Sequence, residues 1–378
     1  MCATSGFRYH GSQRIAPTLT PVLGWFGYGF EQPPLPPSET SPTEGLALAS
    51  QPLVPNDPMF SQQWHLGKIG ATNAWAISTG NTNVVVAVLD TGINYLHEDL
   101  AANMWRNPGE VPGNGIDDDG NGFVDDVHGI VTCSDGLGSE GDPFDEGFPG
   151  GSGQVYHGTF IAGLIGALGN NARGVAGVNW SVQLMAIKIG GPTDVPNPVS
   201  DTIEAFEYVV LMKRRGVNIR VTSNSYATDP PSVFSQALKE AIDAAGEEGV
   251  LNVFAAGNYG TGTLDADLIL RYPQRYDSPS IVTVAASDQS DNLASLSDYG
   301  RTSIDLAAPG VDIAGAWGPA TNSYVTGRNG TSYACPLVAG AAALLLASNP
   351  SLTVNELKAA LFGSVDASAG LKGKVATN

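Results

Sequence analysis

Ser332 is the residue whose setting most directly suggests covalent chemistry. It stands in the stretch RNGTSYACPLVAG at 328–340, where a long run with almost no charge begins. A serine at this place can cap a helix, because its hydroxyl oxygen accepts a free backbone N–H. The same place sets the hydroxyl beside amides that favour developing negative charge, which suits an acyl-transfer nucleophile. The stretch alone favours the capping role, although Gly330 and the nearly uncharged helix that follows point toward a nucleophile. A nucleophile would need a base and an orienting acid elsewhere in the chain.

Candidates for the acid and the base lie at the ends of other predicted elements. Asp90 follows the apolar run VVVAVL at 84–89, and His157 opens the helix-like stretch HGTFIAGLIGAL at 157–168. Asn258 follows another apolar run. Taken singly, an aspartate or asparagine at a strand end is an ordinary turn residue, and a histidine at a helix start is often only solvated. Glycine costs about 1 kcal/mol in a helix, so the glycines of the histidine stretch predict a helix that approaches a neighbouring backbone closely.

The elements that must position these residues alternate along the chain. Continuous apolar or β-branched runs, typical of buried parallel strands, occur at 84–89, 182–189, 219–226, 250–256 and 281–286. Helical patterns lie at 157–168, 200–216 and 231–249. This alternation predicts an α/β fold, a doubly wound, mostly parallel sheet with helices on both faces. In such a sheet functional side chains collect beyond the carboxyl ends of the strands, where Asp90 and Asn258 fall.

The chain is predicted to consist of a tail and one large domain. Residues 1–54 include a segment rich in Pro, Ser, Thr and Glu, which predicts an extended tail or linker and not a folded propeptide. Residues 55–378 are predicted to form the folded domain. The first residues lack the pattern of a signal peptide, and no run of about 18 apolar residues predicts a membrane span.

Charge and cysteine content exclude several classes of function. The chain carries 18 Lys and Arg against 37 Asp and Glu, a formal charge of −19, so we expect neither a nucleic-acid nor an anionic-membrane partner. Cys2, Cys133 and Cys335 are too few and too odd in number for a disulfide framework and match no zinc spacing. Cys335 follows Ser332 by three residues, so we expect it to share that helix face and to react with thiol reagents. The oligomeric state stays open, with a monomer as the simpler expectation.

An acidic stretch at 113–129, GNGIDDDGNGFVDDVHG, has the spacing of a calcium loop. It contains Asp117, Asp119, Asn121, Gly122 and Asp125 in the pattern D-x-D-x-N-G-x-x-D. Oxygen ligands at alternate positions with a glycine at the turn suit calcium, although the final glutamate of an EF-hand is missing. A solvated acidic loop is the alternative. Like charges packed this densely repel unless a cation or water separates them, so the sequence favours calcium.

Four motifs occur together in the order found in one protease family. They are VVAVLDTGI around Asp90, HGTFIAG from His157, FAAGN ending at Asn258, and GTSYACPLVAG around Ser332. In these motifs the chain resembles the subtilisin-like serine proteases, the subtilases. The resemblance extends from about residue 55 to residue 364, and four motifs in the right order are far more specific than any one of them.

The resemblance implies a role for each of these residues. Ser332 would attack the substrate carbonyl, His157 would take its proton, and Asp90 would hold the imidazole in the correct tautomer. The backbone N–H of Ser332 and the side-chain amide of Asn258 would stabilise the oxyanion. The function implied is a serine endopeptidase that hydrolyses extended polypeptides through an acyl-enzyme. Two alternatives stay open: an inactive peptide-binding module, and a transpeptidase or cyclase that excludes water from the same acyl-enzyme.

Further residues are implied to contact the substrate. The strand segment that pairs with an extended peptide would contain Ser225, Tyr226 and Ala227, and the wall of the primary specificity pocket Ala255, Ala256 and Gly257. Small wall residues leave room for a large P1 side chain. Arg271 stands where the floor of this pocket is expected. Pointing inward it would favour an acidic P1 residue, and pointing outward it would pair with Asp265 or Asp267.

The resemblance also implies a second calcium site and a location. The segments HEDL at 97–100 and LGNNARGV at 168–175 resemble the calcium loop of the family, with Asp99 and Asn171 as ligands. Because the family is mostly secreted, an extracellular location is expected even though no signal peptide is visible.

Overall fold

The computed structural model describes residues 51–132, 142–147, 156–189, 199–226, 233–259 and 264–378. Most of the predicted tail at 1–54 therefore lies outside the described residues. Ala227, one of the predicted substrate contacts, lies outside them too. The tail and the boundary of the folded domain stay predictions.

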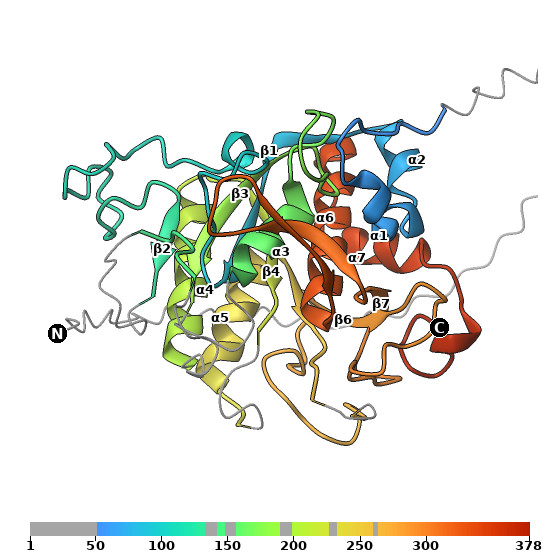
Figure 1. The fold of residues 1–378 in the computed structure, drawn as a ribbon. Helices are drawn as coiled ribbons and strands as arrows, with labels where there is room; N and C mark the ends of the chain where they lie inside the picture. Colours follow the sequence, from blue (N-terminus) through green and yellow to red (C-terminus); the bar gives the residue numbers. More distant parts are fainter. Residues whose placement is uncertain (1–50, 133–141, 148–155, 190–198, 227–232, 260–263) are drawn as a thin grey trace, which may run out of the picture. The chain divides into compact units, whose positions relative to one another are not determined.

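A sheet of seven strands forms the centre of the described chain, in the order β2-β3-β1-β4-β5-β6-β7 (Figure 1). The strands are β1 (Gly80–Asp90), β2 (Gly129–Val131), β3 (Ser181–Lys188), β4 (Ile219–Asn224), β5 (Leu251–Ala255), β6 (Ile281–Ser287) and β7 (Leu306–Pro309). Every neighbouring pair is parallel. The strand order reverses direction at β1, which has β3 on one side and β4 on the other. The predicted α/β fold is confirmed, and its topological switch point lies at the end of β1.

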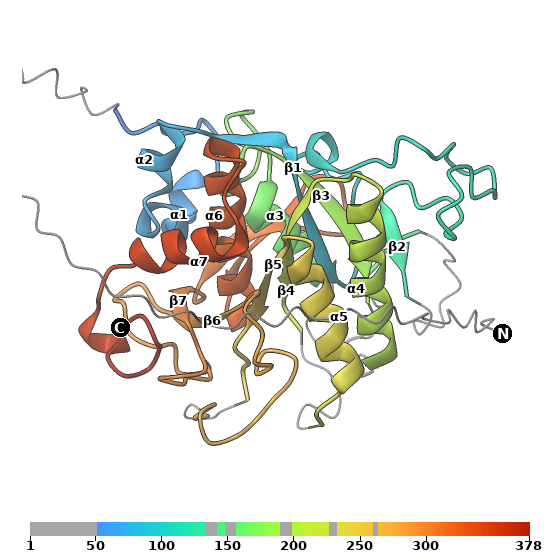
Figure 2. The ribbon, with the colours of Figure 1, turned by 180° about the vertical axis from the view of Figure 1, so that it is seen from behind.

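The strand β1 illustrates why the apolar runs are continuous. Val84, Val86 and Val88 belong to one hydrophobic cluster, and Val85, Ala87 and Leu89 belong to another. Successive side chains of a strand point to opposite faces, so both faces of this strand are buried. The helices α3 (His157–Gly166) and α6 (Thr331–Ser348) cover the first face, and α4 (Val199–Arg214) and α5 (Gln236–Glu247) cover the second (Figure 2).

Several elements have no counterpart among the predicted ones. They are the short edge strands β2 and β7, the helices α1 (Trp64–Lys68), α2 (Ala71–Trp75) and α7 (Val354–Gly363), and the antiparallel pair β8 (Ile313–Trp317) and β9 (Ser323–Arg328). Three single turns of 3₁₀ helix lie at Phe60–Gln62, Ala101–Asn103 and Ala369–Leu371. The start of α7 carries a sequence signal that explains it, a capping box between Thr353 and Glu356.

The helix α6 is apolar all round because it is the central helix of the core. By length and composition its 18 residues could cross a membrane, contrary to the expectation that the chain has no such run. However, 78% of the helix is buried inside the protein, where it contacts β1, β4, β5 and β6. An apolar helix buried in a core passes the same compositional test as a membrane span.

Candidate functional site

The end of β1 and the start of α3 bring Asp90 and His157 together. Asp90 is the last residue of its strand, and His157 is the first of its helix. The His157 Nδ1 atom lies 2.7 Å from Asp90 Oδ1, and both residues are buried. Because Nδ1 donates to the carboxylate, Nε2 of the neutral ring keeps its lone pair. Nε2 is buried and has no hydrogen-bond partner within the described part of the chain.

Close backbone packing fixes α3 against the turn after β1. A Cβ atom on Gly158 would lie 2.1 Å from the carbonyl oxygen of Gly92. The Gly158 N–H donates to Thr91 Oγ1 at 2.9 Å. Only glycine permits this approach, so the close contact predicted for this helix is confirmed.

Reciprocal hydrogen bonds hold Ser332 against the end of β4. Ser225 Oγ donates to the carbonyl oxygen of Ser332 at 2.9 Å, and Ser332 Oγ donates to the carbonyl oxygen of Ser225 at 3.2 Å. The Ser332 carbonyl is available because Pro336, four residues further along α6, has no N–H to donate. The missing helical bond thus becomes a link between α6 and β4.

Tyr333, the residue after Ser332, lies beside the His157 ring, but no hydrogen bond joins the Ser332 hydroxyl to that ring in the described chain. Ser332 Oγ bonds to Ser225, as described, and the rings of His157 and Tyr333 have centroids 5.7 Å apart. Hydrogen bonds between a nucleophile and its base are often long or unformed until substrate binds, so this arrangement is compatible with such a pair.

The Asn258 side chain joins the loop after β5 to the first turn of α6. Its Oδ1 accepts from the Thr331 backbone N–H at 2.8 Å and from Thr331 Oγ1 at 3.0 Å. A backbone N–H can only donate, so the amide oxygen must face Thr331, and Nδ2 faces the other way. The residue that precedes α6 is Gly330, which has no side chain to cap the helix. Asn258 therefore caps α6 from a different element and keeps its own donor free to point elsewhere.

The residues predicted to contact the substrate follow β4 and β5. Ser225 and Tyr226 come directly after β4. The Tyr226 ring packs against Phe254 with centroids 6.3 Å apart, and its hydroxyl donates to Asn224 Oδ1 at 3.2 Å. The Tyr226 side chain therefore points into the protein, and it is the backbone of this segment that can meet a partner.

At the end of β5 the chain is small and tightly packed. Ala255 and Ala256 are buried, and Gly257 has a φ of +117°. A Cβ atom on Gly257 would lie 2.5 Å from Asp298 Oδ2. Both the backbone angle and the close carboxylate require glycine here.

Arg271 stacks on Tyr259 in the loop after β5. Its guanidinium carbon lies 3.6 Å from the centroid of the tyrosine ring. Burial raises the pKa of Asp298 to about 6, with the Tyr259 N–H and the charge of Arg271 acting in the opposite direction. Asp267, one of the two partners expected for an outward Arg271, is instead 3.6 Å from Arg275. Arg271 thus belongs to a cluster with Tyr259 and Asp298.

Carboxylates of the acidic loop accept hydrogen bonds from the loop's own backbone. Asp117 accepts from the N–H groups of Asn121 and Gly122, and Asp125 accepts from those of Gly113, Asn114 and Gly115. The Asn121 amide donates to Asp126 Oδ2 at 2.8 Å. Of the four side chains of this loop that are predicted to bind calcium, only Asp119 belongs to a group of three carboxylates that converge in the described residues.

That group consists of Glu110, Asp119 and Asp126, whose ligand atoms all lie within 4.8 Å of one another. Asp126 is fully buried and accepts from the hydroxyl of Tyr208 at 2.7 Å. Glu110 Oε2 is buried without a hydrogen-bond partner among the described residues. The sequence reading missed Glu110 because it precedes the acidic stretch. It also passed over Asp126, whose only signal was its place next to Asp125.

Asp99 and Asn171, predicted from the resemblance to bind calcium, contact each other directly. Asn171 Nδ2 donates to Asp99 Oδ1 at 2.8 Å, and Asp99 Oδ2 accepts from the Val175 N–H at 3.1 Å. The two residues are brought together, but with an amide nitrogen facing the carboxylate.

Cys335 is inaccessible, contrary to the expectation of a reactive thiol. It is a free, fully buried cysteine whose Sγ lies 3.4 Å from the carbonyl oxygen of Val253. Burial raises the pKa of its thiol to about 11. A buried neutral thiol is a poor nucleophile, so this side chain acts as packing.

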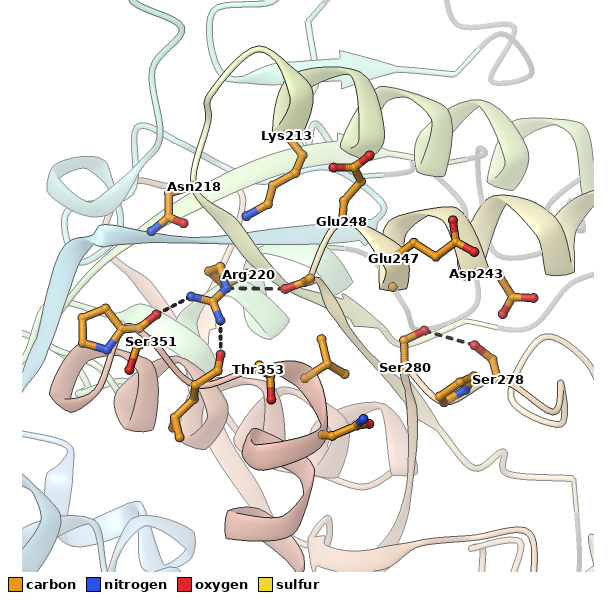
Figure 3. A pocket seen from close by; sticks show the side chains of 17 residues that line it. Lys213, Asn218, Arg220, Asp243, Glu247, Glu248, Ser278, Ser280, Ser351 and Thr353 are labelled. Carbon is orange, nitrogen blue, oxygen red and sulfur yellow. Dashed lines mark hydrogen bonds between the residues drawn. The ribbon is translucent and has the colours of Figure 1, made fainter. Parts of the chain in front are cut away.

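A cavity of about 720 Å³ lies at the end of the sheet where the strands begin, opposite to the end that carries Asp90 (Figure 3). Residues at the amino ends of β4, β5 and β6 line it, among them Arg220, Gly249 and Ser280. The Arg220 guanidinium donates to the carbonyl oxygens of Gly249, Pro350 and Leu352. The cavity is therefore remote from Asp90 and His157, which lie at the carboxyl ends of the strands.

Comparisons with known proteins agree on one family. A family model described as the subtilase family matches residues 81–375. Subtilisin Savinase from Lederbergia lenta is 34% identical over 292 residues, which is 77% of this chain and 86% of the relative. An alkaline protease from Shouchella clausii is 33% identical over 331 residues, 85% of this chain and 71% of the relative.

Two further matches extend the comparison. The halolysin-like extracellular serine protease Nep from Natrialba magadii is 32% identical over 307 residues, 81% of this chain and 48% of that protein. A solved protease structure from Pseudoalteromonas arctica superposes with a TM-score of 0.64 at 26% identity, covering 85% of this chain and 96% of the other.

Proposed function

The chain belongs to the subtilase family of serine proteases, and from this premise we propose that it is an endopeptidase whose nucleophile is Ser332. The observation that carries the proposal is the buried Asp90–His157 pair, 2.7 Å between Oδ1 and Nδ1, which leaves Nε2 without a partner in the described chain. A base with its lone pair free and its other nitrogen held by a carboxylate is what an activated serine requires.

In the proposed reaction Ser332 Oγ attacks the substrate carbonyl carbon, and its proton moves to His157 Nε2. Asp90 stabilises the imidazolium without taking its proton. The imidazolium then protonates the departing amine as the peptide C–N bond breaks, which leaves an ester on Ser332. A water molecule, deprotonated by His157, hydrolyses this ester and restores the serine.

The developing oxyanion would be met by two donors at the start of α6. The Ser332 backbone N–H lies in the first turn of that helix, where orphan N–H groups and the helix dipole favour negative charge. Asn258 Nδ2 is the second donor, since Oδ1 is committed to Thr331 at 2.8 Å. The amide is oriented before substrate binds, which is the condition for electrostatic stabilisation of a transition state.

A polypeptide substrate would bind along the segment that follows β4. The backbone of this segment is the part that would pair with a peptide, because the Tyr226 side chain turns inward against Phe254. Ala227 would continue this segment. Ala255, Ala256 and Gly257 would form the wall of a pocket for a large P1 side chain, while Arg271, stacked on Tyr259, would border it.

Calcium is proposed as a structural ion of the acidic loop. Glu110, Asp119 and Asp126 fit a hard cation, because three carboxylates converge and one oxygen of Glu110 is buried without a partner in the described chain. Calcium bound there would neutralise their mutual repulsion and hold the loop to the fold. Asp117, Asn121 and Asp125 are kept as an alternative set, and Asp99 with Asn171 as a second candidate site.

We also propose that the protein acts outside the cell. The support is the resemblance to proteases of this kind, one of which, from Natrialba magadii, carries the word extracellular in its name.

Labelling by a fluorophosphonate probe tests the function. We expect covalent label on Ser332 of the full chain, located by mass spectrometry of the modified peptide, and its loss in His157→Ala. Incubation with a long peptide then separates the alternatives by product mass. Cleaved ends support the protease, joined or cyclic products identify a transpeptidase, and a folded protein that retains peptide without label identifies a binding module.

A further inference from the structure

Asp145 is a buried carboxylate that takes no part in the reaction proposed above. It lies in the segment 142–147 and is 1% exposed. Its Oδ2 accepts from Thr159 Oγ1 at 2.7 Å and from the Thr159 backbone N–H at 3.2 Å, and its Oδ1 accepts from the Gly147 N–H at 3.4 Å. Burial of a carboxylate is unfavourable unless hydrogen bonds compensate it. Here the compensating hydrogen bonds come from Thr159 and Gly147, so the question is what these contacts hold in place.

The contacts of Asp145 fall on the first turn of α3, which His157 begins. The residue before the helix, Tyr156, has a φ of 61° and makes no side-chain cap. The Gly158 N–H donates instead to Thr91 Oγ1, and the Thr159 N–H donates to Asp145 Oδ2. Two side chains from elsewhere in the chain therefore replace the cap that this helix lacks.

The same carboxylate also reaches the turn that holds Asp90. Thr91 Oγ1 donates to Asp145 Oδ2 at 3.5 Å, and the Thr91 N–H donates to Asp90 Oδ1 at 2.8 Å. Thr91 thus contacts the carboxylate of Asp90, the first turn of α3 and Asp145. Asp145 lies where the turns that carry Asp90 and His157 meet.

The segment that carries Asp145 is itself anchored to the turn after β1 and to the end of β3. The Ile93 N–H donates to the carbonyl oxygen of Pro143 at 3.0 Å. Lys188, the fully buried last residue of β3, donates through Nζ to the carbonyl oxygen of Phe144 at 3.2 Å and to Glu146 Oε2 at 2.7 Å. These contacts fix residues on both sides of Asp145 and so fix its carboxylate.

We propose that Asp145 is a positioning residue, which holds the His157 turn of α3 in register with the Asp90 turn of β1. This inference rests on the proposed function, because it gives His157 the role of general base. A negative charge at a helix N-terminus is favourable, and the placement of a catalytic group matters on a scale of about 1 Å. Asp145 would therefore act through His157 and not on the substrate.

Burial and the neighbouring charged groups set the pKa of Asp145. Burial, the largest effect, and the charge of Asp90 together raise its pKa to about 7, while the hydrogen bonds from Thr159 and Gly147 act in the opposite direction. The other titratable groups around it are His157 and Tyr156 at the start of α3, Lys188 from β3, and Glu146 beside it. Above about pH 7 Asp145 is charged, and a negative charge at the first turn of α3 is favourable, so its charge and its hydrogen bonds both hold this turn.

The test compares Asp145→Asn with a matched variant, Asp305→Asn, in the full chain. Asp305 is a carboxylate whose pKa burial also raises and which accepts from a backbone N–H, that of Thr283, at 2.7 Å, but it lies between β6 and β7. Label incorporation, kcat, KM and Tm are measured for both and for the wild type.

We expect Asp145→Asn to lower kcat by about tenfold to a hundredfold with KM within a factor of two. Asp305→Asn is expected to change Tm and leave kcat unchanged. An Asp145 variant that behaves like the Asp305 variant overturns the inference. A wild type that takes no label overturns the proposed function and this inference with it, whereas a labelled wild type with an unaffected Asp145 variant overturns this inference alone.

A second pair of variants decides the matter if Asp145→Asn does not fold. Thr159→Val keeps the side-chain shape and removes the hydroxyl that donates to Asp145, while Thr159→Ser keeps the hydroxyl. We expect Thr159→Val to lower kcat and Thr159→Ser to stay near the wild type. Equal kcat values for the two would overturn the inference.

Discussion

In the proposed function, Asn258 has two roles, one at each end of its side-chain amide. Its oxygen caps α6 through the Thr331 N–H at 2.8 Å, and this commitment leaves Nδ2 to point toward an oxyanion. The cap and the proposed donor are therefore coupled, because the bond to Thr331 sets the orientation of the whole amide. A variant that keeps the cap and loses the donor can separate the two.

Asn258→Asp is such a variant, since a carboxylate still accepts from Thr331 but has no N–H to offer. We expect Tm close to that of the wild type and a kcat lower by about a hundredfold to a thousandfold, as for removal of an oxyanion donor in enzymes generally, with little change in KM. Peptide hydrolysis and thermal unfolding measure the two quantities. A kcat within tenfold of the wild type would argue that Asn258 is only a cap.

Among the elements, α3 is held at its start by contacts outside itself. Its first turn is capped from Thr91 and packed backbone to backbone against Gly92. The helix is also buried throughout. Small residues in this helix are unfavourable for helix formation and favourable for docking, and docking prevails because tertiary packing overrides propensity.

Gly158→Ala tests this docking. The added Cβ would lie 2.1 Å from the Gly92 oxygen, so the helix start must shift, and we expect a loss of roughly 1–3 kcal/mol in stability together with a loss of activity. Gly67→Ala in α1 is the matched control, because no atom lies within 4 Å of the added Cβ, and it should be neutral or slightly stabilising. Equal effects on Tm would contradict the packing argument.

At the scale of the whole molecule, the excess of acidic groups creates a need for cations. The formal charge is −19, and carboxylates converge at Glu110, Asp119 and Asp126. Some of this repulsion is offset within the chain, as where Arg215 lies 3.1 Å from Asp119. A bound cation would offset more.

Calcium removal is expected to lower Tm, measured in a Ser332→Ala background to prevent autolysis. A ligand present at a hundredfold excess over its Kd stabilises by about 2.7 kcal/mol. Glu110→Gln should reduce the difference in Tm between calcium and chelator, whereas Asp117→Asn should leave it nearly intact. The reverse result would favour the D-x-D set over the carboxylate group at Glu110.

The folding free energy should also depend on pH through Asp145. Its pKa is raised to about 7 in the folded protein, so the folded state binds more protons than the unfolded state between about pH 4 and pH 7. The contribution of Asp145 to the free energy of unfolding must therefore fall as pH rises through this window. In the Ser332→Ala background, Asp145→Asn should gain stability relative to its parent from pH 4.5 to pH 7.5 in urea unfolding. A constant difference would show that the carboxylate is not protonated in this range.

The residues and elements that sequence predicted share one property, which is that their signals are local. Apolar runs of strand length, the capped helical patterns and the short motifs around Asp90, His157 and Ser332 each lie within about twenty residues. The strand β1 and the helix α3 were predicted for this reason, with their ends displaced by a few residues.

The tertiary structure alone decided the contacts between residues that are far apart in the chain. The link from Pro336 through Ser332 to Ser225, the cap of α6 by Asn258, the carboxylate group at Glu110 and the burial of Asp145 against Thr159 all join separate elements. No local pattern marks Asp145, because its neighbours are set by strand order and helix docking. The sequence therefore determined which groups could do the chemistry, and only the packed fold determined what holds them in place. The reason is that side-chain periodicity is a property of one element, whereas the contacts that position a side chain join different elements.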